Sequence, residues 1–349
     1  MFMSFLNQRN IYALSWLMLL SACSLFGNQK EATDANTAAN DSIQETVIVK
    51  EPEIKEVLPA DIVFEKALLY DQYTLEDKYP YKDTVRVFQW DKIRKELAKV
   101  ENAQRKPTAW GVVRNRKNVN GESPLVKKYS RNAYKNISDT LGTERYQSVP
   151  LYLLTDTITP EIYATDGTLF RFIGYNNDSS LVHVAHVYGD GEWFIPKKYM
   201  KYIEPINFKR IAVVDRTNQN IAILEKDSTS TNKWLIRSQN PATTGAHHPP
   251  FQKETPLGIF VVQEKKQKMF FLIDGTSKIA GYTPYASRFT NGGYIHGVPV
   301  NYPRQNIIEW SATLGTIPRS HMCVRNASSH AKFVYDWAQV DKSLVIVIE

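Results

Sequence analysis

The sequence has little cysteine and, after its first residues, no long apolar run. Cys23 and Cys323 are the only cysteines among 349 residues, too few for a disulfide framework. No later stretch approaches the roughly 20 apolar residues that a membrane-spanning helix needs. Disulfide-stapled domains and multi-spanning membrane proteins are therefore excluded. A hydrophobic content of 43% is ample for folded domains.

Concentrated charge is also lacking. The formal net charge is +7 and the isoelectric point is about 9.1, yet the basic residues are spread thinly along the chain. Because no basic groove motif is present, we expect no nucleic-acid partner. A mildly basic surface fits a polyanionic cell wall or an anionic lipid surface.

The first residues have the features of an export signal. The apolar run Ile11–Leu20 is too short to span a bilayer, and Leu20-Ser21-Ala22-Cys23 resembles the bacterial lipobox. That resemblance implies a lipoprotein signal peptide over residues 1–23, lipidation of Cys23 and a periplasm-facing place in the cell envelope, with the outer membrane as the expected membrane. An ordinary secretory leader and an uncleaved anchor are the alternatives. Residues 24–60 lack an apolar period and are expected to form a flexible tether.

Residues 61–108 are predicted to form a helical lead-in. The helix is expected to start near Gln89 and to end before Pro107. Its apolar residues fall at helical spacing, at Trp90, Ile93, Leu97 and Val100.

Residues 109–205 carry short β-branched and aromatic segments separated by Asp, Asn and Gly turns, which predict a small barrel or sandwich. The opening Val149–Tyr152 and the closing Gly191-Glu192-Trp193 resemble a bacterial Src-homology-3-like domain. This resemblance implies a module that binds wall peptides or braces a catalytic domain. His183 and His186 could form a metal pair, but the spacing offers no third ligand, so we expect no metal.

Residues 206–349 are predicted to form a second β-rich unit. Arg210–Asp215 and Gln219–Glu225 have the spacing of a hairpin. The only clear helix is Ser328–Trp337, and Ser343–Ile348 is a last strand. The whole chain is therefore predicted to be mainly β with few helices.

The residues that could carry chemistry gather near the C-terminus. If Cys23 is lipidated, Cys323 is an unpaired thiol in an exported protein, and such a thiol is either buried and inert or present for its reactivity. It lies in Ser320-His321-Met322-Cys323-Val324-Arg325, downstream of His296-Gly297. Nearby histidines and arginines favour a thiolate without metal or cofactor. The pattern predicts a Cys/His nucleophilic site, and a structural core cysteine is the alternative.

This pattern resembles the signature of L,D-transpeptidases of the YkuD type, a His-Gly followed by Ser/Thr-His-Gly-Cys-x-Arg/Asn. Thr255-Pro256-Leu257-Gly258 also matches the family's Thr-Pro-x-Gly turn, and the resemblance extends over about Phe208–Glu349. It implies a C-terminal β-sandwich catalytic domain with a cleft, no cofactor, and peptidoglycan stem peptides as substrates.

Carried onto this chain, the resemblance implies that Cys323 attacks the bond between diaminopimelate and D-alanine in a tetrapeptide stem and passes the acyl group to an acceptor amine. His296 would accept the thiol proton, held in its tautomer by a carbonyl near Gly297. The N–H groups of Met322 and Cys323 would stabilise the oxyanion. The supporting residues would be His321 at the cleft wall, Arg325 on a substrate carboxylate or bracing the loop, and Ser320.

Two features depart from the family pattern. Met322 occupies the position of the family glycine, which costs on the order of 1–2 kcal/mol if the backbone there needs a positive φ. The spacer of residues 297–319 is longer than usual. Both features bear on substrate choice and oxyanion geometry, but neither removes a reacting group.

Other functions are compatible with the same residues. A papain-like endopeptidase needs a histidine after Cys323 in the chain, and only His330 is available. A wall-binding lipoprotein with a catalytically silent cleft is favoured by Met322. An L,D-carboxypeptidase would use water as the acceptor. The acceptor and the oligomeric state are left open.

Overall fold

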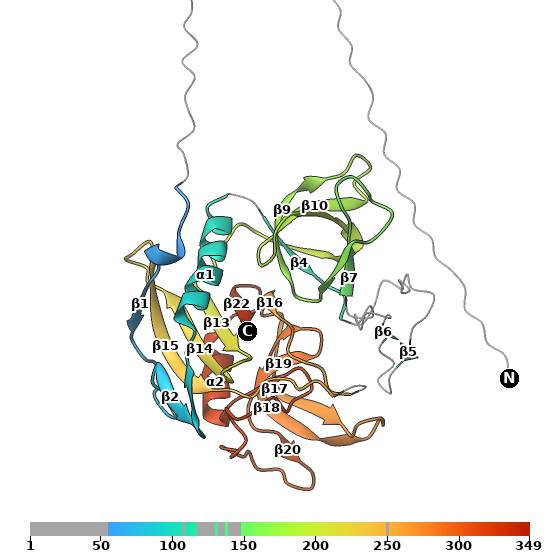
Figure 1. Cartoon of the computed structure of the whole chain (residues 1–349). Coiled ribbons are helices and arrows are strands. Elements are labelled where there is room, and N and C mark those ends of the chain that lie inside the picture. Colours follow the sequence, from blue (N-terminus) through green and yellow to red (C-terminus); the bar gives the residue numbers. More distant parts are fainter. Residues whose placement is uncertain (1–54, 107–108, 117–129, 132–136, 139–147, 249–250) are drawn as a thin grey trace, which may run out of the picture. The chain divides into compact units, whose positions relative to one another are not determined.

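Strands make up most of the regular structure, and α-helices are few (Figure 1). The computed structural model describes residues 55–106, 109–116, 130–131, 137–138, 148–248 and 251–349, which contain two α-helices. The predicted mainly β architecture is therefore confirmed. Cys23, the predicted signal peptide and the tether up to residue 54 lie outside the described residues. Within the described residues, no helix is long and apolar enough to cross a membrane.

The larger sheet of the C-terminal part has six strands in the order β1-β15-β14-β13-β22-β16. These are β1 (Val63–Lys66), β13 (Arg210–Asp215), β14 (Asn220–Lys226), β15 (Lys233–Pro241), β16 (Gly258–Val261) and β22 (Ser343–Ile348). β13 and β14 form the predicted antiparallel hairpin, in which Asp215 pairs with Asn220. β22 runs parallel to β13 and is buried at every position, as expected for a central strand that is covered on both faces.

The smaller sheet has the order β17-β18-β19-β21, with one further strand paired to β18. Its strands are β17 (Glu264–Leu272), β18 (Ile279–Thr290), β19 (Gly293–His296), β20 (Val300–Asn301) and β21 (Val324–Arg325). Val214 and Val347 of the larger sheet share one apolar core with Phe289 and Ile295 of the smaller sheet. This face-to-face packing is that of a β-sandwich, as predicted. The second helix, α2 (Ser328–Trp337), adds Val334 to the same core.

The lead-in covers the other face of the larger sheet. Leu97 and Val100 of α1 (Trp90–Gln104) belong to a second core with Ile211 and Leu344. The predicted helix is therefore confirmed, and it continues four residues past Val100. The lead-in also contains η1 (Pro59–Asp61) and a hairpin of β2 (Lys78–Tyr81) and β3 (Thr84–Val87), while β1 pairs in parallel with β15.

The described residues between 109 and 203, here called the small domain, form a sheet of their own. Its order is β11-β10-β9-β4-β12, from β4 (Trp110–Val113), β9 (Leu169–Tyr175), β10 (Leu181–His186), β11 (Glu192–Pro196) and β12 (Met200–Ile203). A hairpin of β7 (Ser148–Leu151) and β8 (Ile162–Thr165), a short pair of β5 (Ser130–Arg131) and β6 (Ile137–Ser138), and η3 (Lys197–Tyr199) complete it. The Src-homology-3-like identity of this domain stays a prediction.

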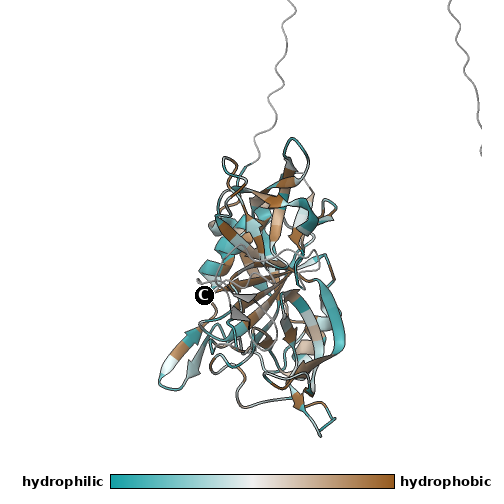
Figure 2. Ribbon diagram, turned by 90° about the vertical axis from the view of Figure 1, so that its right-hand side faces the viewer, coloured by the Kyte–Doolittle hydropathy of each residue, from teal (hydrophilic) through white to brown (hydrophobic). Residues whose placement is uncertain are grey.

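The small domain has a core of its own but also shares one with the lead-in and the larger sheet. Trp110 and Leu169 lie in the same buried cluster as Phe208 and Ile211. The Trp110 indole N–H donates to the Ile206 carbonyl at 3.0 Å. Figure 2 shows apolar residues along the inner strands and hydrophilic residues on outer strands and loops. Burial of this indole therefore joins the small domain to the rest of the described unit.

Candidate active site

A cleft of about 890 Å³ opens beside the smaller sheet and contains most of the predicted site. Six of the seven predicted site residues line it: His296, Ser320, His321, Met322, Cys323 and Arg325. Gly297 is not among the lining residues, and its carbonyl contacts the His296 ring. The strands bring the two halves of the motif together, because β19 ends at His296 and pairs in parallel with β21, which begins after Cys323.

Cys323 is buried, and its thiol is held by the β18–β19 turn. The Sγ atom donates a hydrogen bond to the Gly292 carbonyl at 3.4 Å, and the Tyr294 N–H donates to the sulfur. Burial raises the pKa of the Cys323 thiol to about 11, although the Tyr294 N–H and the Arg325 guanidinium both act to lower it. The thiol is therefore protonated at neutral pH in this state.

His296 is fixed in one tautomer. Its Nδ1 lies 2.6 Å from the Gly297 carbonyl oxygen, and because a carbonyl can only accept, Nδ1 carries the proton and Nε2 carries a lone pair. Burial lowers the pKa of His296 to about 3, and the Arg325 charge acts in the same direction. The imidazole is thus neutral and can act as a base.

Glycine is required after His296 because the chain passes close to other atoms. A Cβ on Gly297 would lie 2.6 Å from the Ser328 hydroxyl and 2.8 Å from the Pro284 ring. The Ser328 hydroxyl in turn accepts from the Val298 N–H at 3.1 Å. The close packing at Gly297 keeps its carbonyl within reach of the His296 ring.

Arg325 places a guanidinium group in the lining of the cleft. Its backbone N–H donates to the Thr243 carbonyl at 2.8 Å, and its carbonyl accepts from the Thr243 N–H at 2.9 Å. Among the described residues its buried Nε has no hydrogen-bond partner. Burial lowers the pKa of Arg325, as expected for a charge removed from water. An anionic ligand would relieve this desolvation.

Met322 has a φ of +77°, in the left-handed region that favours glycine. The positive φ considered at the position of the family glycine is therefore present here, although Met322 has a side chain. The Thr255 hydroxyl donates to the Met322 carbonyl at 2.8 Å and accepts from the Gly245 N–H at 2.9 Å. A Cβ on Gly245 would lie 2.8 Å from the Met322 backbone. The Thr-Pro-x-Gly turn thus fixes the backbone beside Cys323.

Ser320 and His321 contribute to the loop of Cys323 in different ways. The buried Ser320 hydroxyl donates to the Cys323 carbonyl and closes the turn. His321 lies at the cleft rim, where its Nε2 is 3.0 Å from a carboxylate oxygen of Asp274 in the β17–β18 turn. The two sides of the cleft mouth are therefore in contact.

Sequence reasoning missed the two groups that hold the thiol, Gly292 and Tyr294. Both act through backbone atoms, which no side-chain motif records. Asn291-Gly292 is nevertheless a strong two-residue hairpin signal, and it could have located the turn. The cationic lining from Arg116, Lys253, Lys266 and Lys268 was also missed. A weak signal for it was the lysine-rich run at residues 265–268.

Other histidines do not join this site. His183 pairs with Glu192 at 2.8 Å, and the His186 Nδ1 accepts from the Tyr188 and Gly189 N–H groups, so each has a local role in the small domain. His330 is completely buried, with Nε2 at 2.9 Å from the Ser238 hydroxyl. Because His330 does not line the cleft, the papain-like arrangement is excluded. No group of potential ligands among the described residues could hold a metal ion.

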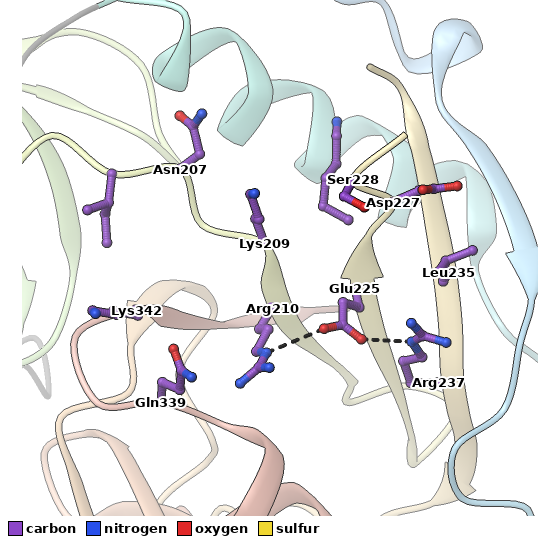
Figure 3. A pocket seen from close by; sticks show the side chains of 12 residues that line it. Asn207, Lys209, Arg210, Glu225, Asp227, Ser228, Leu235, Arg237, Gln339 and Lys342 are labelled. Carbon is purple, nitrogen blue, oxygen red and sulfur yellow. Dashed lines mark hydrogen bonds and ion pairs between the residues drawn. The ribbon is translucent and has the colours of Figure 1, made fainter. Parts of the chain in front are cut away.

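A separate hollow of about 480 Å³ lies outside the cleft and contains none of the predicted site residues (Figure 3). The two arginines that Figure 3 links by dashed lines, Arg210 and Arg237, both contact the Glu225 carboxylate, at 3.5 and 2.8 Å. The Glu225 carboxylate therefore offsets part of the positive charge of these two arginines.

Comparison with known proteins bears on the C-terminal part. Residues 209–347 match the family model named YkuD, the L,D-transpeptidase catalytic domain. This part of the chain is similar to YkuD domains. The segment includes both the cleft and the two halves of the Cys/His motif, whereas the lead-in and the small domain lie outside the match. No curated protein matches the chain.

Solved structures give looser similarities. An L,D-transpeptidase from Mycobacterium smegmatis is 17% identical, with a TM-score of 0.33 over 52% of this chain and 77% of that one. L,D-transpeptidase 3 from Mycobacterium tuberculosis, solved with a faropenem-derived adduct, is 14% identical, with a TM-score of 0.33 over 52% and 91%. A fused Zn-dependent amidase/peptidase from Clostridium acetobutylicum is 19% identical, with a TM-score of 0.28 over 40% of this chain. The chain spans about half, 52%, of that protein.

Proposed function

We propose that the protein is a peptidoglycan L,D-transpeptidase with Cys323 as nucleophile and His296 as base. The observation that carries the proposal is the pairing of β19 with β21, which brings His296 and the Cys323 loop to one cleft. That cleft lies within the segment that matches the YkuD model. Five of its lining residues are lysines or arginines, which suit a substrate rich in carboxylates: Arg116, Lys253, Lys266, Lys268 and Arg325.

The acylation step follows from the resting protonation states. His296 Nε2 takes the thiol proton as Sγ attacks the carbonyl between diaminopimelate and D-alanine. The N–H groups of Met322 and Cys323 stabilise the oxyanion. As the C–N bond breaks, His296 returns the proton to the amine of the departing D-alanine, and a thioester remains on Cys323.

The second step consumes the thioester. An acceptor amine attacks the thioester carbonyl, His296 removes a proton from that amine, and the Cys323 thiol is regenerated as the C–S bond breaks. Arg325 is half-buried, and its Nε has no hydrogen-bond partner among the described residues, so it is suited to hold a stem-peptide carboxylate during both steps. With water as acceptor, the same steps make the protein an L,D-carboxypeptidase.

Incubation of purified muropeptides with residues 55–349, followed by mass spectrometry, tests this function. A cross-linked dimer or a D-amino-acid-exchanged stem supports the transpeptidase. A tripeptide without cross-links supports the carboxypeptidase. Unchanged tetrapeptide with a folded protein would support a silent wall-binding lipoprotein instead.

We further propose that Cys23 carries the lipid anchor, so that the enzyme faces the periplasm from the outer membrane. The proposal rests on the lipobox-like Leu20-Ser21-Ala22-Cys23. Cys23→Ser should remove the lipid mass and release the protein from membranes. Unchanged membrane partitioning together with no lipid mass on the parent protein would contradict the anchor.

A further inference from the structure

One turn of the small domain inserts into the sandwich beside the catalytic hairpin. It comprises Asp166, Gly167 and Thr168, between β8 and β9. Thr168 forms a β-bridge with Phe260, and the Val261 N–H donates to the Gly167 carbonyl at 3.0 Å. Gly167 has a φ of +90°, and a Cβ there would lie 2.0 Å from the Phe289 carbonyl oxygen. A side chain at position 167 would therefore clash with the Phe289 carbonyl, so only glycine fits there.

Asp166 is fully buried at this junction. Its Oδ2 accepts from Arg288 at 2.6 Å and from Gln263 at 3.0 Å. Its Oδ1 accepts from the Asn115 N–H at 2.9 Å. A buried carboxylate with a close guanidinium and two further donors is held in one geometry, because each lost partner would leave charge or polarity unpaired in the interior.

The backbone of Asp166 is hydrogen-bonded to the β18–β19 turn, which contains Gly292. The Thr290 hydroxyl donates to the Asp166 carbonyl at 2.6 Å, and the Asp166 N–H donates to the Asn291 side-chain oxygen at 3.2 Å. The next residue, Gly292, provides the carbonyl that accepts from the Cys323 thiol. Two hydrogen bonds therefore tie the small domain to the residues just before that carbonyl.

A second set of hydrogen bonds, made by side chains, connects Asp166 to Tyr294. Arg288, the partner of Asp166, also donates from Nε to the Glu264 carboxylate at 3.2 Å. The same Glu264 oxygen accepts from the Tyr294 hydroxyl at 3.0 Å. The N–H of Tyr294 donates to the Cys323 sulfur, and its ring packs in one cluster with Cys323. Both hydrogen-bond partners of the thiol are thus connected to Asp166.

We propose that Asp166 is a positioning residue for the catalytic thiol, so that the small domain completes the active site as well as any wall-binding role it has. Through Thr290 and Asn291 it fixes the Gly292 carbonyl, and through Arg288 and Glu264 it fixes Tyr294. The catalytic consequence rests on the proposed function, whereas the effect on the thiol itself does not.

The test is Asp166→Asn in the full chain, with two readouts. The first is alkylation of Cys323 by iodoacetamide across a pH series. Loss of the Tyr294 N–H bond to sulfur should move the midpoint of alkylation to higher pH. The second is acylation by a soluble carbapenem, whose rate constant should fall on the order of tenfold while the concentration for half-maximal rate changes little.

Lys201→Met is the matched control, because Lys201 pairs with Asp341 across the same junction without contact to the hairpin. It should leave both readouts unchanged. Thr290→Val is the second variant if Asp166→Asn does not fold, since it removes one hydrogen bond to Asp166 and introduces no charge. It should shift both readouts in the same direction by a smaller amount.

A folded Asp166→Asn protein with the parental alkylation profile and acylation rate would overturn the proposal. So would an equal effect of Lys201→Met, because that would indicate general loosening of the junction. If the parent protein alkylates normally but never acylates, the proposed function fails while the alkylation profile still decides the role of Asp166.

Discussion

At the residue scale, the motif indicated the two candidate reacting groups but not their protonation states. Sequence pattern named Cys323 and His296 because a thiol and an imidazole in that arrangement have a recognisable chemistry. It could not give their burial, which depends on the packing of strands distant in sequence. Burial shifts the two pKa values apart, to about 11 and about 3. A neutral pair therefore replaces the thiolate that the neighbouring cations suggested.

This neutral pair predicts a flat pH profile. His296 must be unprotonated to accept the thiol proton, and its lowered pKa keeps it so until the pH falls near 3. The rate constant of carbapenem acylation should therefore vary little between about pH 5 and pH 9. Stopped-flow absorbance at single-turnover conditions measures it. An acid limb near the ordinary histidine pKa would contradict the lowered pKa of His296.

Met322 gives a second residue-scale prediction. Its φ of +77° is strained for a side-chain residue and natural for glycine, so Met322→Gly should acylate at least as fast as the parent. Met322→Ala is the control, because it removes the side chain but keeps the strain. Cys323→Ala and His296→Ala should abolish acylation. Acylation that appears only in Met322→Gly would show that the parental cleft is catalytically silent.

At the element scale, the sequence pattern predicted those helices and hairpins whose formation depends on residues close together in the chain. The helical spacing of Trp90, Ile93 and Leu97 located α1, and the turn at residues 216–218 located the β13–β14 hairpin. Parallel pairing of β1 with β15 and of β13 with β22 joins segments more than a hundred residues apart. No spacing within either segment encodes such a partner, so the sheet order could not be predicted.

The spacer of residues 297–319, between the two halves of the motif, also depends on contacts with segments distant in sequence. Its length departs from the family pattern, and residues of the lead-in contact it. Arg86 of β3 donates to the carbonyls of Gly315 and Thr316, and Tyr73 packs on Trp310 with ring centroids 4.4 Å apart. The lead-in thereby holds the loop that precedes Cys323.

Thr255 provides the element-scale prediction. Its hydroxyl bridges the Gly245 N–H and the Met322 carbonyl inside the fold, and Thr255→Val would leave both groups unpaired. Unfolding free energy should fall by about 1–3 kcal/mol, measured by urea denaturation. The acylation rate should also fall, because the Met322 backbone loses its support. Full stability with full activity would contradict the role assigned to this turn.

At the scale of the whole molecule, the buried His296 and His330 and the half-buried His186 couple stability to pH. Burial lowers the pKa of His186 to about 4 and those of His296 and His330 to about 3. Between pH 6.5 and those values, the unfolded chain binds protons that the folded protein excludes. Stability is therefore lost on acidification below pH 6.5, with a slope of up to about 1.4 kcal/mol per pH unit for each histidine.

His330 isolates one contribution to this slope because it lies away from the cleft. His330→Leu should flatten the dependence of unfolding free energy on pH between about 4 and 6 by up to one histidine's share. Ser238→Ala is the matched control, since it removes the hydroxyl partner of His330 without removing a titratable group. Urea denaturation at several pH values provides the measurement, and an unchanged slope in His330→Leu would contradict the assignment.

The central claim is that Cys323 forms a thioester with a tetrapeptide stem, and mass spectrometry of the intact protein tests it most directly. After rapid mixing of residues 55–349 with a disaccharide tetrapeptide and an acid quench, the account predicts a mass gain equal to the donor minus D-alanine. Peptide mapping should place it on Cys323, and Cys323→Ala should lack it. A folded parent protein that shows no adduct and releases no D-alanine would contradict the account.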